Sequence, residues 1–135
     1  MPFPVDLKYI LDAEEQLQVK LPSSLSEYLQ RWNGAEIEIE EDDWQVFSVL
    51  DKSNRKQIAR SWNDIVSGNK SASSCAGFPP KAIAIAQNGS GDYLVLLPHI
   101  DNPSQLNDCA LIWDHETGVT TEVDKLSILL KRRVN

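Results

Sequence analysis

Cysteines, basic residues and long apolar runs are all scarce in this 135-residue sequence. Its two cysteines, Cys75 and Cys109, allow at most one disulfide and match no zinc or redox motif, so we expect reduced thiols in the cytosol. The apolar runs at residues 82–86 and 93–97 are far shorter than the ~20 residues of a membrane-spanning helix. The first residues lack the basic start and apolar core of a signal peptide. We therefore expect a cytoplasmic protein that does not insert into a membrane.

The shortage of basic residues gives the protein a strong negative charge. The sequence contains thirteen Lys and Arg residues and twenty Asp and Glu residues, which gives a net charge of -7 at pH 7. A surface of this charge repels nucleic acid and attracts a basic protein partner. The hydrophobic content of 41% is ordinary for a folded protein, and the length suits a single domain over residues 1–135.

Apolar residues at helical spacing predict two helices in the N-terminal part. The first covers residues 5–17, and the second runs from Pro22 in its first turn to a left-handed stop at Asn33-Gly34. A capping box formed by Ser24 and Glu27 would start the second helix slightly later. The side chains expected to face inward are Leu7, Ile10, Leu11 and Leu17 from the first helix, and Leu25, Tyr28, Leu29 and Trp32 from the second.

Two further helices are predicted later in the chain. One begins at a Ser53 cap and ends at Gly68, before a loop over residues 69–77. The last begins near residue 124, and the basic residues 131–133 complement the negative end of its dipole. The side chains expected to face inward are Ile58, Trp62, Ile65 and Val66 from the first of these, and Leu126, Leu129 and Leu130 from the second.

The apolar period changes to two between these helices, which predicts strands. Glutamates alternate with isoleucines over residues 36–40, a turn follows at 41–43, and a second strand over 44–50 completes a hairpin. Further strands are predicted over residues 82–86, 93–97, 110–113 and 119–123, the last two as another hairpin. Helices flank this run of strands instead of alternating with them, which favours an α+β fold with a mainly antiparallel sheet covered by helices.

Three short motifs occur in order along most of the chain. They are LPSSLSEYL at residues 21–29 before Asn33-Gly34, AQNGSGDYLVLLP at 86–98, and LIWDHE at 111–116. Together they resemble the SUKH superfamily of bacterial toxin-immunity proteins and fungal cell-wall regulators. The resemblance implies a SUKH-like fold and a non-catalytic protein that neutralises a cognate toxin domain, such as a nuclease, by occlusion. A regulatory protein-interaction module like the fungal members is the alternative that it leaves open.

Two groups of residues invite a catalytic or ligand-binding interpretation. The stretch Gly89-Ser90-Gly91-Asp92 lacks the lysine of a phosphate loop and leads into a strand, so we interpret it as a turn in which Asp92 accepts backbone hydrogen bonds. A metal or acid-base site could draw on His99, Asp114, His115 and Glu116, but their spacing matches no ligand motif. A metal-dependent hydrolase built on Asp92, His99, His115 and Glu116 stays a further alternative. We expect no cofactor, no bound metal and no catalytic residue.

An acidic run is the strongest candidate for a partner-binding surface. Six of the twenty acids lie in the eight residues 36–43. They form either a solvated strand face or a docking surface for a basic toxin, and the neighbouring Trp44 is either a surface anchor or a core residue. The residues expected to bind the partner are Glu36, Glu38, Glu40, Glu41, Asp42, Asp43, Trp44, Asp92, His115 and Glu116.

Overall fold

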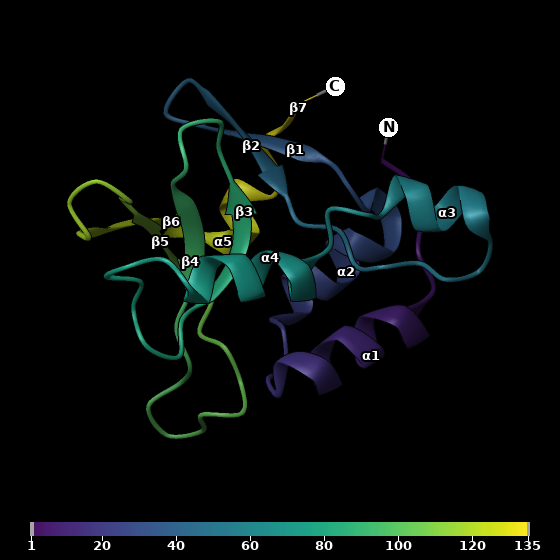
Figure 1. The fold of residues 1–135 in the computed structure, drawn as a ribbon, viewed down its shortest axis with the longest axis horizontal. Helices are drawn as coiled ribbons and strands as arrows, with labels where there is room; N and C mark the ends of the chain where they lie inside the picture. The colour runs from purple at the N-terminus through teal and green to yellow at the C-terminus, as the bar shows by residue number, and fades with distance from the viewer. Residues whose placement is uncertain (1, 135) are drawn as a thin grey trace.

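Five helices and seven strands make up the computed structural model, which describes residues 2–134. In chain order they are α1 (Leu7–Leu17), α2 (Ser23–Trp32), β1 (Glu36–Ile39), β2 (Asp42–Val46), α3 (Arg55–Arg60), α4 (Ile65–Ser73), β3 (Ile83–Gln87), β4 (Tyr93–Leu96), β5 (Cys109–Trp113), β6 (Thr120–Lys125), α5 (Leu126–Leu129) and β7 (Arg133–Val134) (Figure 1). Within these residues, no helix is both long enough and apolar enough to cross a membrane. Cys75 and Cys109 are both free.

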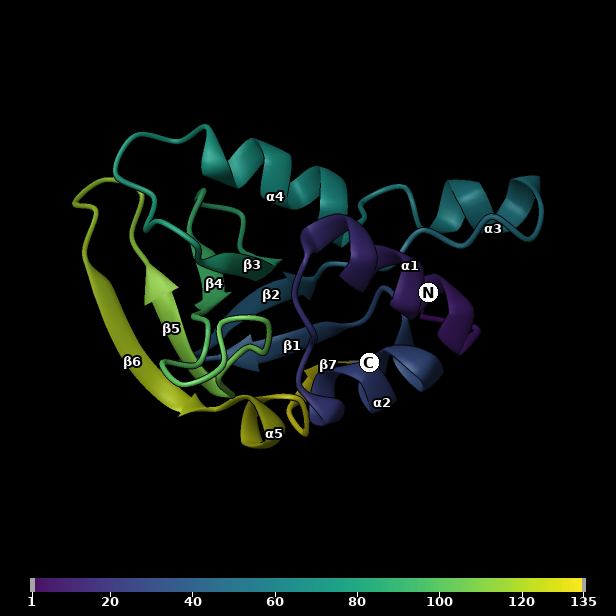
Figure 2. The ribbon, with the colours of Figure 1, turned by 90° about the horizontal axis from the view of Figure 1, so that it is seen from below.

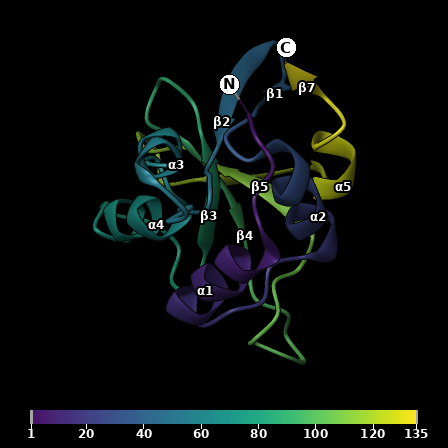
Figure 3. The same cartoon turned by 90° about the vertical axis from the view of Figure 1, so that its right-hand side faces the viewer.

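All seven strands belong to one sheet, in the order β6-β5-β4-β3-β2-β1-β7. Every neighbouring pair is antiparallel. The sheet is strongly curved, and α5 lies between its two edge strands, β6 and β7 (Figure 2). Helices α1 and α2 pack on each other, α2 also packs on α5, and α4 covers the opposite side of the sheet from α5 (Figures 2 and 3). The prediction of an α+β fold with an antiparallel sheet is confirmed.

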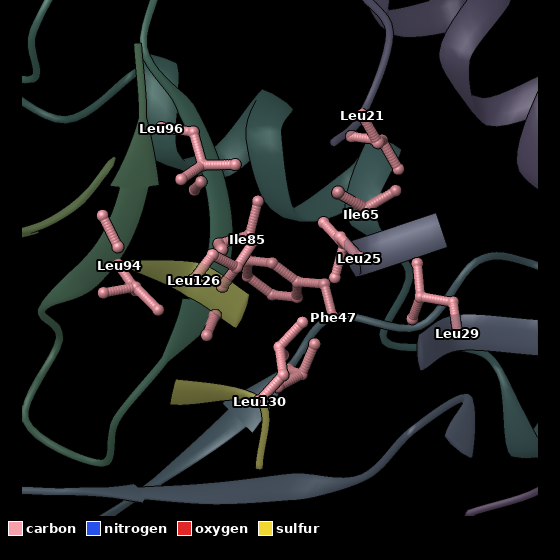
Figure 4. Packing of buried hydrophobic residues seen from close by; sticks show 14 of the residues in the cluster. Leu21, Leu25, Leu29, Phe47, Ile65, Ile85, Leu94, Leu96, Leu126 and Leu130 are labelled. Atoms are coloured by element: carbon pink, nitrogen blue, oxygen red, sulfur yellow. The ribbon is translucent and has the colours of Figure 1, made fainter. Parts of the chain in front are cut away.

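The core forms where α2 and α5 meet the sheet. Leu25 and Leu29 of α2 and Leu126 of α5 are almost fully buried, beside Ile85 of β3 and Phe47 (Figure 4). Burial of a large apolar side chain is worth about 1.5–3 kcal/mol. The predicted apolar stripes of α2 and α5 therefore face the core.

Helix α1 differs from its prediction. Its buried side chains are Ile10 and Ala13, whereas Leu7 and Leu11, also predicted to face inward, are exposed.

The predicted helix from Ser53 to Gly68 is two helices, α3 and α4. The side chain of Asn54, not that of Ser53, caps α3, and the Asp64 carboxylate caps α4 by accepting the backbone N–H groups of residues 66 and 67. Gly68 does not end a helix: a Cβ there would lie 2.7 Å from the Phe47 ring, so glycine allows the two to approach. Helix α4 consequently continues to Ser73, through part of the predicted loop.

The structure decides the positions of two tryptophans, Trp62 and Trp44. Trp62 follows α3 and is 75% exposed, so its predicted place in the core is wrong. Trp44 is 2% exposed and pairs with Ile37 in the neighbouring strand, so its interpretation as a surface anchor is wrong and the core alternative holds. Trp32 is half-buried, with the guanidinium carbon of Arg133 3.6 Å from its ring centroid.

The last predicted helix is only one turn, α5, and the chain then forms a strand. Strand β7 pairs with β1, and the carbonyl oxygen of Arg132 accepts the backbone N–H of Glu38 at 3.0 Å. Without this pairing, β1 would leave its backbone groups unpaired at a sheet edge. The basic residues therefore do not complement a helix dipole: Arg132 bonds to Asp124 at 2.8 Å, and Arg133 lies over Trp32.

Candidate protein-binding surface

The acidic run forms a tight hairpin, named here the acidic hairpin (residues 36–43). Strands β1 and β2 are joined at Glu40 and Glu41, slightly before the predicted turn, and both residues have positive φ, 52° and 68°. Two successive positive φ angles suit a type I′ turn, in which Asn-Gly is the usual sequence. Glutamate carries a Cβ that disfavours this conformation, so the hairpin tip is strained. All six acids of the hairpin are exposed.

The strand register groups part of this charge on one face. Glu36 and Glu38 alternate with buried isoleucines in β1, and Glu38 lies directly opposite Asp43 of β2. Like charges at opposing positions of a sheet repel each other. None of the ion pairs found among residues 2–134 involves an acid of the hairpin. Within the described part of the chain, the hairpin thus holds a row of negative charge that forms no ion pair.

Asn88 connects the acidic hairpin to the glycine-rich turn between β3 and β4. Its Oδ1 accepts the backbone N–H groups of Ser90 and Asp92, at 3.0 and 3.1 Å. Its Nδ2 donates to Asp42 Oδ2 at 3.1 Å and to Asp92 Oδ2 at 3.3 Å. Asn88 is therefore the residue that closes this turn, a role that the sequence assigned to Asp92. Figure 1 shows the hairpin tip beside the turn.

Asp92 instead accepts backbone and side-chain hydrogen bonds from the turn between β5 and β6. Its Oδ1 accepts the His115 backbone N–H at 3.1 Å and lies 2.7 Å from the ring Nδ1 of the same residue. The imidazole packs over Gly91, where φ is 98° and a Cβ would lie 3.4 Å from Nδ1. Glycine suits this position because of its backbone angle, which side-chain-bearing residues rarely adopt. The pair formed by Asp92 and His115 thus fixes two distant turns against each other.

The geometry of the pair shifts the pKa of each member. For Asp92, burial raises the carboxyl pKa, but hydrogen bonds from the His115 ring, the His115 backbone and Asn88 outweigh it and leave the pKa below its ordinary value. For His115, the hydrogen bond to Asp92 raises the imidazole pKa, slight desolvation opposes it, and the charges of Asp92, Glu116 and Asp114 raise it further. The two groups therefore favour a charged pair.

These shifts predict a pH dependence for the link between the two turns. Asp92 contributes stability that is present above its unfolded pKa and is lost as the pH falls through its lower folded pKa. His115 contributes stability that is complete below its unfolded pKa and is lost as the pH rises through its higher folded pKa. Both stability contributions are therefore complete between roughly pH 4 and 6.5, the ordinary pKa values of the two groups, and each is lost outside this range. We expect an NMR titration to show an elevated His115 pKa that falls in Asp92→Asn. A His115 titration unchanged by that substitution would contradict the pairing.

The two turns that Asp92 and His115 connect also contain three potential metal ligands. Among residues 2–134, ligand atoms of Asp92, Asp114 and His115 lie within 4.8 Å of one another. All three side chains already form hydrogen bonds: Asp92 Oδ1 and His115 Nδ1 bond to each other, and Asp114 Oδ1 accepts the backbone N–H groups of residues 116 and 117. His99 lies in the connection between β4 and β5 and is not part of this group. The arrangement is that of a turn held by carboxylates.

The structure joins most of the predicted partner-binding residues. Asp42 connects through Asn88 to Asp92 and His115, and Glu116 Oε1 lies 3.9 Å from His115 Nε2. Trp44 does not belong to this surface because it is buried. Asn88 was missed by sequence reasoning, although an asparagine that opens a glycine-rich turn is a recognisable signal for side-chain capping.

The sequence matches a protein-family model over most of its length. The family model described as SMI1 / KNR4 family (SUKH-1) matches residues 4–131. No curated protein and no solved structure matches the chain. The matched region contains the acidic hairpin, the glycine-rich turn and the turn that carries His115.

Proposed function

Because the chain belongs to the SMI1/KNR4 (SUKH-1) family, we propose that it is an immunity protein that binds a cognate toxin domain and neutralises it by occlusion. The SUKH family includes toxin-immunity proteins, and its members are generally non-catalytic immunity or regulatory modules. The protein acts by binding alone, with no reacting group of its own. We place it in the cytosol, where Cys75 and Cys109 stay reduced.

The observation that supports this proposal best is the charge of the acidic hairpin, whose acids are exposed and form no ion pair among residues 2–134. The hairpin projects its acids from a β-sheet, and the Asn88 side chain ties Asp42 to the neighbouring turn. A surface held in this way is complementary to a basic cleft. Toxins that cleave nucleic acid have basic clefts because their substrate is a polyanion. A nuclease toxin therefore matches the charge of this surface.

To inhibit the toxin by occlusion, the acidic hairpin must occupy the toxin's basic cleft and so exclude the nucleic-acid substrate. Rim charges contribute little to affinity, at most about 1 kcal/mol for an exposed pair, but they accelerate encounter and set the register. The like-charge pair of Glu38 and Asp43 reduces stability in the free protein and is relieved when a cation of the partner lies between them. The acids thus favour the bound state.

Co-expression with the toxin domains encoded beside this gene tests the proposal. One of these toxins should lose its toxicity, and the two proteins should elute as one complex from gel filtration. Toxicity that persists for every neighbouring toxin, with no complex formed, would contradict immunity. A stable complex with an endogenous protein in the absence of any toxin gene would instead identify a regulatory module. Metal-dependent turnover by the purified protein would overturn the non-catalytic assignment.

A further inference from the structure

A groove of about 730 Å³ lies between α2 and the C-terminal segment of the chain. Figure 2 shows α2 beside α5 and β7, the elements that form its walls. The residues relevant to its chemistry are Ser24, Tyr28, Arg31, Trp32, Lys131 and Arg133. We call it the α2–β7 groove.

The α2–β7 groove gathers positive charge in an acidic protein. Arg31, Lys131 and Arg133 line it together with one acid, Glu27. None of these three cations has an ion-pair partner among the described residues, whereas the adjacent Arg132 pairs with Asp124. The Arg133 guanidinium lies over the Trp32 ring, at 3.6 Å from its centroid, which restrains it by a cation–π contact. The groove therefore holds three cationic side chains that form no ion pair within residues 2–134 and can bind an anionic group.

Two residues that line the groove, Ser24 and Tyr28, also carry buried hydroxyl groups that lack a partner. Tyr28 is 8% exposed, and neither its Oη nor Ser24 Oγ forms a hydrogen bond within residues 2–134. Burial raises the pKa of Tyr28 to about 12, although the nearby Arg133 charge opposes this, so the phenol keeps its proton at neutral pH. A buried donor without an acceptor destabilises the protein that contains it. The hydroxyls and the three cations are all hydrogen-bond donors, and a negatively charged acceptor is the group that suits both kinds.

We propose that the α2–β7 groove binds a carboxylate side chain of an acidic peptide segment from a protein partner. Arginine and lysine form charge-assisted hydrogen bonds with a carboxylate, and the Tyr28 hydroxyl donates to the same group. Leu130 and Trp32 provide apolar surface for a neighbouring side chain of the segment. A nucleic acid is disfavoured because Glu27 lies in the groove and the protein has a net charge of -7.

This site is independent of the proposed immunity function, because it lies on α2, α5 and β7 and uses none of the acidic hairpin's side chains. The protein then has two binding surfaces of opposite charge. The acidic hairpin accepts a basic surface, and the α2–β7 groove accepts an acidic segment.

Fluorescence anisotropy with a labelled short peptide of Asp, Glu and Leu tests the assignment on the full chain. The peptide should bind the wild-type protein, and Arg31→Gln with Lys131→Gln should weaken binding at least about tenfold. Tyr28→Phe should weaken it about fivefold while leaving the unfolding midpoint unchanged or higher, since it removes a hydroxyl that has no partner. A purely structural tyrosine would show no effect on peptide binding.

The matched control is Arg55→Gln with Lys56→Gln, which removes the same charge from exposed positions on α3. This control should keep wild-type affinity. The proposal is overturned if the peptide does not bind, if the control weakens binding as much as the groove variant, or if a peptide of Asn, Gln and Leu binds equally well. Displacement by inorganic phosphate as effective as that by unlabelled acidic peptide would also overturn it, in favour of a phosphate site.

Discussion

Reversal of two charges on the acidic hairpin, Glu38→Lys with Asp43→Lys, is expected to slow association with the cognate toxin by about 10- to 100-fold at low salt. Both side chains are exposed and lie opposite each other on neighbouring strands. The substitution therefore replaces a negative face, which attracts a basic toxin, by a positive face, which repels it. The dissociation rate should change less, because exposed charges contribute little to short-range packing. Stopped-flow measurements over a range of salt concentrations give both quantities.

A control with the same total charge separates the hairpin from the overall field of the protein. Glu15→Lys with Asp101→Lys reverses two exposed acids outside the acidic hairpin. This variant should associate at nearly the wild-type rate, and all three proteins should converge at high salt, where screening removes the steering. Equal slowing by both double variants would show that net charge, not the acidic hairpin, attracts the toxin. Circular dichroism should show the same fold for each.

The acidic hairpin illustrates what a sequence can reveal about this surface. Alternation of glutamate with isoleucine predicts a strand with one wet face, because successive side chains point to opposite sides of a sheet. The position of the turn was harder to predict. Glu40 and Glu41 adopt positive φ, which glutamate does not favour, and the pairing of Ile39 with Asp42 encloses them in a two-residue turn. The register of the two strands, not the preference of the turn residues, decides this turn.

Contacts between distant segments account for the parts that the sequence did not predict. Asn88 reaches Asp42 across 46 positions of sequence, and Asp92 reaches His115 across 23. Strand β7 forms because β1 offers an unpaired edge, so the basic C-terminal residues leave the helical pattern. Periodicity reports which face of an element is apolar, but it does not report which distant element will cover that face.

The tryptophans give the largest expected effect on stability. Trp44→Ala should lower the free energy of unfolding by about 3–5 kcal/mol, because it removes a buried indole and leaves a cavity that neighbouring side chains fill only in part. Trp62→Ala removes the same side chain from a position that is 75% exposed, so it should change stability by less than about 0.5 kcal/mol. Urea denaturation followed by circular dichroism measures both. Similar losses in the two variants would contradict the burial seen in the structure.

A third variant shows whether Trp44 acts in binding as well as in folding. Trp44→Phe keeps an aromatic ring in the core, so the protein should stay folded, with an unfolding free energy between those of the wild type and Trp44→Ala. Because Trp44 is 2% exposed, the association and dissociation rates with the toxin should match those of the wild type. A faster dissociation in Trp44→Phe would mean that the hairpin opens to expose the indole on binding, as a surface anchor requires. Unchanged rates would leave the neighbouring acids as the part of the hairpin that the toxin contacts.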